Sequence, residues 1–165
     1  MGWPFRKSTE RKTRLPEAWE EASGLEPEAH PSPGFEALSQ WLRTVSAPRI
    51  LDLGEAVGPN LDYFAERSAR LHVVALYSAL QSHPAGPERL DALSAQVFAD
   101  LLPVTGEGSF DVILLWDLFN YLSRPQIRAL GQQLTRLSHP GTRALAMISN
   151  RAQVPAAPVP FKIVD

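Results

Sequence analysis

The sequence predicts an α/β fold in which helices cover both faces of a mostly parallel sheet of about five strands. Three observations support this prediction. Short apolar runs alternate with helical patterns, the first run leads into a glycine-bearing turn, and proline-rich segments bound the alternation on both sides. Strands that alternate with helices specify a parallel sheet with right-handed crossovers, because each crossover packs its helix back onto the sheet.

The length and composition of the chain indicate one folded domain between two less regular segments. With 165 residues, of which 44% are hydrophobic, the chain can bury one sizeable core. We expect a flexible segment rich in proline and charge over residues 1–34, the folded domain over residues 35–150, and a proline-rich tail over residues 151–165. The tail closes with an apolar pattern over residues 161–165 that resembles the start of a sixth strand.

Apolar spacing places the elements along the domain. Residues 35–45 are expected to form a helix because their apolar side chains recur every three or four positions. The helix over residues 123–137 has the clearest boundaries, since Ser123 caps it, Gln126 takes the capping-box position and residues 139–141 stop it. The expected strands span residues 49–53, 71–77, 95–99, 110–116 and 143–149, and a further helix spans residues 60–70.

The segment over residues 49–60 carries the strongest functional signal. An apolar strand enters a turn that contains Gly54 and Gly58, and the turn leaves through a helix start at Pro59 and Asn60. Glycine lets a ligand approach the backbone, and in open parallel sheets ligands bind beyond the carboxyl ends of the strands. The segment therefore predicts a nucleotide-type site at the end of the first strand.

The residues of this turn resemble the first motif of the class I S-adenosylmethionine (SAM) dependent methyltransferases. That motif is an acidic residue in a strand followed by Gly-x-Gly-x-Gly. Asp52, Gly54 and Gly58 match it, and Ala56 stands at the middle glycine. The resemblance implies a Rossmann-like methyltransferase fold.

Two later runs extend the resemblance. The Ser-Phe-Asp-Val run at residues 109–112 is similar to a family pattern at the fourth strand, in which Asp111 takes the place of a structural aspartate. The run at residues 137–142 looks like the family's Leu-x-Pro-Gly-Gly turn before the fifth strand. The resemblance covers residues 35–149, so the chain is expected to lack the full C-terminal antiparallel hairpin of the family's seven-stranded sheet.

The resemblance also implies how SAM is held. The glycine turn takes the methionine part with Asp52 beneath it, and Asp100 matches the acid that accepts the adenine amino group. Residues 71–83 contain no ribose-binding acid, and Tyr77 stands near its position. Losing charge-assisted hydrogen bonds of about 1.5–3 kcal/mol each weakens SAM binding about ten- to hundredfold. The implied cofactor-binding residues are Asp52, Gly54, Ala56, Gly58, Asn60, Tyr77, Phe98, Asp100, Leu101 and Trp116.

The expected function is SAM-dependent methyl transfer to a small molecule or metabolite by in-line displacement. Alignment of nucleophile and methyl group supplies much of the acceleration, so a general base is optional. Asp117, Tyr121 and His83 are the candidate bases by position. The residues after the fourth strand do not form the Asn/Asp-Pro-Pro-Tyr/Phe motif, so the resemblance does not extend to nucleic-acid amino methyltransferases.

Two other functions stay open at this stage. A catalytically inactive, methyltransferase-like interaction module is favoured by Ala56 and by the missing ribose acid. A nicotinamide-dependent oxidoreductase is disfavoured by Pro59, because proline has no backbone N–H to offer a pyrophosphate.

Net charge, cysteine content and the lengths of apolar runs limit the classes of partner that we expect. The formal charge of -2 gives no electrostatic reason to expect nucleic acid, and the lack of cysteine excludes disulfides and thiolate-bound metal, so we expect no metal site. Because the chain has no apolar run of about 18 residues and no signal-peptide core, we expect a cytoplasmic protein without membrane contact. An exposed edge on the last strand is expected to promote self-association.

Overall fold

The computed structural model describes residues 31–85, 87–102, 109–150 and 154–164. Within these ranges a four-stranded sheet has the order β2-β1-β3-β4, and every neighbouring pair is parallel. The strands are β1 (Arg49–Asp52), β2 (Arg70–Val73), β3 (Phe110–Trp116) and β4 (Ser138–Ala146). The helices are α2 (Pro33–Leu42), α3 (Gly58–Glu66), α4 (Leu76–Gln81), α5 (Pro87–Leu101) and α6 (Arg124–Leu137), with a 3-10 turn η1 (Leu118–Asn120).

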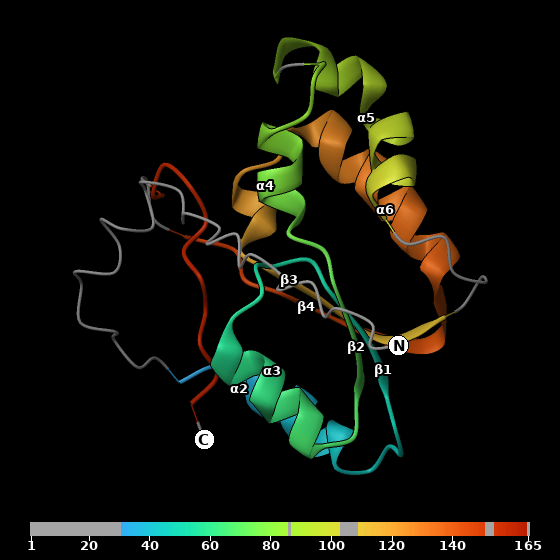
Figure 1. The fold of residues 1–165 in the computed structure, drawn as a ribbon, viewed down its shortest axis with the longest axis vertical. Coiled ribbons are helices and arrows are strands. Elements are labelled where there is room, and N and C mark those ends of the chain that lie inside the picture. Colours follow the sequence, from blue (N-terminus) through green and yellow to red (C-terminus); the bar gives the residue numbers. More distant parts are fainter. Residues whose placement is uncertain (1–30, 86, 103–108, 151–153, 165) are drawn as a thin grey trace, which may run out of the picture.

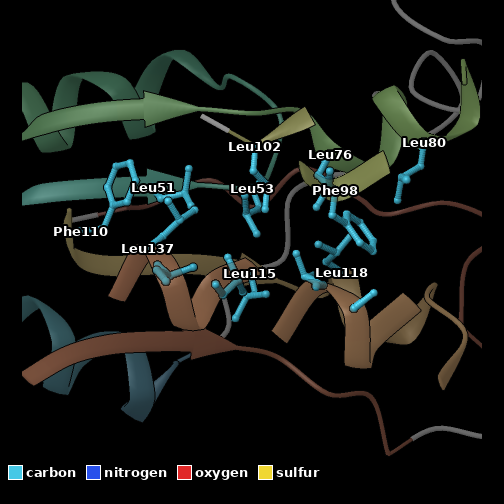
Figure 2. Packing of buried hydrophobic residues seen from close by; sticks show 14 of the residues in the cluster. Leu51, Leu53, Leu76, Leu80, Phe98, Leu102, Phe110, Leu115, Leu118 and Leu137 are labelled. Carbon is cyan, nitrogen blue, oxygen red and sulfur yellow. The ribbon is translucent and has the colours of Figure 1, made fainter. Parts of the chain in front are cut away.

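Helices cover both faces of the sheet, as the alternation of elements predicts. Figure 1 shows α5 and α6 on one face and α2 and α3 on the other. Successive strand side chains point to opposite faces, so the apolar strands supply both cores. The core under α5 and α6 contains Leu51, Leu53, Ile113 and Leu115. The core over α2 and α3 contains Ile50, Val112, Leu114 and Trp116. Figure 2 shows the first of these cores, which Phe98 and Leu137 complete from the helices.

The start of α6 confirms the expected capping box. The Ser123 hydroxyl accepts the Gln126 N–H at 3.3 Å, and the Gln126 side chain accepts the Ser123 N–H at 3.0 Å. The helix ends at Leu137 as expected, but β4 begins directly at Ser138. Ser138 pairs with Phe110 and the next pair joins Arg143 to Val112, so residues 139–142 form a bulge inside the strand rather than a turn before it.

The expected strand over residues 95–99 is wrong, because this run lies within α5. Val97 and Phe98 are buried while Asp100 is exposed, which is the pattern of a helix with one apolar face. Short apolar runs fit a strand and a buried helix equally well by periodicity alone. The sheet therefore has four strands in the described residues instead of about five.

The second strand is shorter than expected, and the tail forms no strand where it is described. β2 ends at Val73, and α4 begins at Leu76 inside the range expected to be extended. Residues 154–164 contain neither the expected opening of a sixth strand nor a hairpin. The segment over residues 1–30 lies outside the described residues, and the domain begins at α2, which Ser32 caps by accepting the Phe35 N–H at 3.3 Å.

β4 lies at one edge of the four-stranded sheet and β2 at the other. Self-association through the β4 edge stays a prediction. No helix in the described ranges is long and apolar enough to cross a membrane.

Candidate functional site

The strand order reverses between β1 and β3. From β1 the chain passes to β2 on one side and then to β3 on the other side of β1. In open parallel sheets a ligand binds outside the carboxyl ends of the strands at this switch point. A cavity of about 30 Å³ lies there. Its lining comes from the ends of both strands and from two later segments, as Leu53, Gly54, Glu55, Tyr77, Leu115, Trp116, Asp117, Leu118 and Pro158.

Asp52 lies beneath the glycine turn, where the sequence pattern places it. One carboxyl oxygen, Oδ1, accepts the Gly54 N–H at 2.9 Å and the Trp116 indole N–H at 2.7 Å. The side chain is only 2% exposed, and this burial raises the pKa of Asp52, while the two hydrogen bonds oppose the shift. Asp52 therefore fixes the end of β1 to the end of β3.

The space that Gly54 leaves is filled by the indole of Trp116. A Cβ at position 54 would lie 2.6 Å from Cδ1 and 2.8 Å from Nε1 of that indole. Trp116 also has a φ of 49°, in the left-handed region that L side chains rarely adopt. Such strain costs about 1–3 kcal/mol and persists only where the surroundings impose it. Here the Asp52 hydrogen bond and the close approach to Gly54 hold the indole in place.

The rest of the glycine turn is more open. Ala56 and Gly58 are exposed, and a Cβ built on Gly58 would meet nothing within 4 Å. The following helix begins at Gly58, two residues earlier than expected. Asn60 is only 3% exposed, and its amide donates to the Phe161 carbonyl and accepts the Ile163 N–H, both at 2.8 Å.

Two of the three candidate bases come together with Tyr77. The Tyr121 hydroxyl lies near the Asp117 carboxyl, and the rings of Tyr77 and Tyr121 meet edge to face with centroids 5.5 Å apart. Burial raises the pKa of Asp117, and burial followed by the nearby Asp117 charge raises the pKa of Tyr121 to about 12. Tyr121 therefore stays protonated at neutral pH and donates a proton in hydrogen bonds. The third candidate, His83, accepts the Ala85 N–H at 3.2 Å and does not line the cavity.

The described part of the tail lies across this group of residues. Tyr77 and Tyr121 donate their hydroxyls to the carbonyls of Ala156 and Ala157, at 3.4 Å and 3.1 Å. The ring of Phe161 stacks on the Trp116 indole, with centroids 5.8 Å apart and planes 8° from parallel. Figure 1 shows the red tail running past the ends of the strands toward α3. The sequence analysis did not predict these contacts, although Phe161 is the one aromatic residue of residues 154–164 and begins their apolar end.

The expected adenine residues do not join the cavity. Phe98 is fully buried in the core, and Leu101 packs against the same core. Asp100 is exposed on α5, where its carboxylate accepts the Gln96 side-chain N–H at 2.8 Å. A helix in place of the expected strand and loop explains this arrangement, and the adenine role of these three residues stays a prediction.

An acid that the sequence pattern did not single out lines the cavity instead. Glu55 follows Gly54 in the turn and accepts the Ser78 hydroxyl of α4. Ser78 is the neighbour of Tyr77, so the Glu55 carboxylate reaches the end of the sheet at which the missing ribose acid was sought.

No group of three or more His, Asp or Glu side chains in the described ranges could hold a metal ion. Comparison of the chain with protein-family models, curated proteins and solved structures finds no match.

Proposed function

We propose that this chain is a methyltransferase-like domain whose SAM site lies at the switch point between β1 and β3. The observation that carries this proposal is the meeting of the glycine turn after β1 with residues 116–118 after β3, where the strand order reverses. The Asp52 hydrogen bonds to both segments make this a fixed junction. The expected acceptor of the methyl group is a small molecule or metabolite.

Glu55 takes the place of the missing ribose acid in this proposal. Its carboxylate lines the same cavity as Tyr77 and is oriented by the Ser78 hydroxyl. A carboxylate accepts charge-assisted hydrogen bonds, which are about twice as strong as neutral ones, so it restores part of the affinity that the lost acid removes.

Asp117 is a better candidate for a proton-accepting group than Tyr121. A general base works best with a pKa near the operating pH. Burial moves the pKa of the Asp117 carboxyl upward toward that range, whereas the pKa of Tyr121 moves away from it to about 12. Tyr121 is then a neutral neighbour of the Asp117 carboxyl, and it donates its own proton to the Ala157 carbonyl.

The cavity does not admit SAM as it stands. A volume of about 30 Å³ holds no more than about two water molecules, whereas ligand pockets have about 300–1,000 Å³. This misfit favours a second candidate function, a non-catalytic interaction module that keeps the sheet and fills the site with its own Trp116. The two candidates differ in whether any form of the chain binds SAM.

Calorimetric titration with SAM and S-adenosylhomocysteine separates them. We expect weak binding to the full chain, and we expect Glu55→Gln to weaken it at least about tenfold, or about 1.4 kcal/mol. Glu66→Gln is the matched control, because Glu66 is exposed on α3 and does not line the cavity. Absence of heat and of a thermal shift at millimolar ligand, in both the wild-type chain and a Phe161→Ala variant, would contradict the SAM site and support the interaction module.

A further inference from the structure

We propose that the carboxyl edge of the sheet is a groove for an extended, proline-rich peptide segment, and that residues 154–164 of this chain occupy it. We further infer that this occupation and SAM binding exclude each other. The exclusion rests on the proposed function, whereas the groove does not.

The first part of the segment is held through its backbone. Two tyrosine hydroxyls, of Tyr77 and Tyr121, donate to the consecutive carbonyls of Ala156 and Ala157. These contacts are made to backbone carbonyls rather than to side chains, as in other modes of extended-peptide recognition. The groove therefore binds the backbone of an extended segment near Ala156 and Ala157.

The second part of the segment satisfies a buried amide. Asn60 is 3% exposed, and it meets both a carbonyl and an N–H of the segment, at Phe161 and Ile163. Buried polar side chains are almost always hydrogen-bonded, and leaving one without a partner costs about 1–3 kcal/mol. Both of these partners of the Asn60 side chain lie in the segment, so Asn60 gives the groove its second polar anchor.

Two apolar contacts complete the groove. Phe161 stacks on the Trp116 indole with planes 8° from parallel, and Pro158 lines the small cavity at the switch point. Pro155, Pro158 and Pro160 restrict the segment to extended backbone conformations, which lowers the conformational entropy that it loses on docking. The composition of the segment thus suits the groove that it occupies.

The exclusion follows from the shared surface. Pro158 and Trp116 line the cavity together with Gly54 and Asp117, and Phe161 stacks on the Trp116 indole. A ligand that binds only the open form has an apparent dissociation constant equal to the intrinsic value divided by the open fraction. Any change that loosens the segment therefore tightens apparent SAM binding.

The test uses full-chain variants within the segment. We expect Phe161→Ala to speed hydrogen exchange of the amides at residues 154–164 and to tighten SAM binding at least about tenfold. Lys162→Ala is the matched control, because its side chain is exposed on the same segment, and we expect its SAM affinity to stay within about twofold of the wild-type value. A synthetic peptide of residues 154–164, added to the Phe161→Ala chain, should weaken SAM binding again, while the same peptide with Phe161→Ala should not.

Each unexpected result contradicts a different part of the proposal: the exclusion, the groove, the SAM site or binding within one chain. Faster exchange in the Phe161→Ala chain with unchanged SAM affinity would overturn the exclusion and leave the SAM site standing. Unprotected amides at residues 154–164 in the wild-type chain would overturn the groove. Peptide binding to the Phe161→Ala chain, without SAM binding to any variant, would support the groove and refute the proposed function. Protection that appears only at high concentration together with a dimer in light scattering would assign the segment to a second copy and overturn its binding within one chain.

Discussion

The two ends of the expected cofactor site differ sharply. At the methionine end, Asp52 and Gly54 lie where the motif places them, and a 2.9 Å hydrogen bond joins them. At the adenine end, Phe98 and Asp100 lie on opposite sides of a helix, one buried and one exposed. The geometry of the methionine end is set by contacts between residues two positions apart. The geometry of the adenine end is set by whether a short apolar run forms a strand or a helix, which depends on the elements that pack around it. Local motifs are therefore the more reliable guide to this site.

The largest expected effect is at the methionine end. Gly54→Ala places a Cβ 2.6 Å from the Trp116 indole, which Asp52 holds by a hydrogen bond, so the indole must move. We expect a loss of about 1–3 kcal/mol in the free energy of unfolding, measured by urea denaturation. Gly58→Ala is the matched control, since its Cβ meets nothing within 4 Å, and it should stay within about 0.5 kcal/mol or gain slightly. Equal stability of the two variants would show that Trp116 does not occupy the space over Gly54.

Asp52 gives the next effect. Asp52→Ala leaves the Trp116 indole N–H and the Gly54 N–H without their acceptor and should cost about 2 kcal/mol. Asp52→Asn keeps an acceptor oxygen and removes the buried charge, so it should cost less.

The same pair of chains tests the pKa of Asp52. Because burial raises this pKa above 3.8, the carboxyl contributes stability below pH 3.8, and that contribution is lost as pH rises through the folded-state pKa. As pH rises from 3.8, the free energy of unfolding of the Asn variant should therefore increase relative to that of the wild-type chain, as measured by urea denaturation across that range. If the wild-type chain instead becomes more stable relative to the variant as pH rises, the folded protein favours the ionised carboxylate.

A smaller effect is expected at the adenine end. Asp100 is exposed and hydrogen-bonds with Gln96 of its own helix, so Asp100→Ala should change stability by no more than about 0.5 kcal/mol. The helical geometry also favours unchanged SAM affinity, which is the opposite of what the family pattern implies for this residue. A tenfold loss of affinity in calorimetry, with a native circular dichroism spectrum, would restore Asp100 to the cofactor site.

The smallest effect concerns the β4 bulge. The Pro140 carbonyl and then the Asp111 carboxylate raise the pKa of His139 above 6.5. The stabilising contribution of protonated His139 is therefore present below pH 6.5 and is lost as pH rises through the raised pKa of His139. Asp111→Asn should lower the pKa of His139 part of the way toward 6.5, as followed by NMR titration of the ring protons. An unchanged titration would assign the whole shift to the Pro140 carbonyl.

Much of the fold could be predicted from sequence because its signals are local. The alternation of apolar side chains assigns Leu51 and Ile50 to opposite faces, and Ser123 with Gln126 marks the start of α6. The strand expected over residues 95–99 failed because a buried helix and a short strand share the same apolar content. The turn expected before the last strand was wrong, and residues 139–142 form a bulge in β4 instead, because strand pairing is decided between segments far apart in sequence.

The predicted site residues Gly54, Tyr77 and Trp116 line one cavity, but the conformation of Trp116 was not predicted. Trp116 was expected to be a cofactor-binding residue, yet its backbone is left-handed and its indole lies against Gly54. Glu55 was overlooked because the ribose acid was sought only after the second strand, although Glu55 reaches the same region from the first. The contacts of Asn60 with Phe161 and Ile163 span more than 100 positions, and no local pattern indicates them.

The most direct test of a SAM site closed by its own chain is a proton–nitrogen NMR titration of the labelled Phe161→Ala chain with SAM. The predicted result is a shift of the Trp116 indole N–H signal and of the amides at residues 54–58, with the α6 amides unmoved. These residues line or adjoin the cavity at the switch point, whereas the outer face of α6 does not. Shifts that are absent at millimolar SAM, or that fall only outside the glycine turn and the end of β3, would contradict the assignment of a cofactor site to this edge of the sheet.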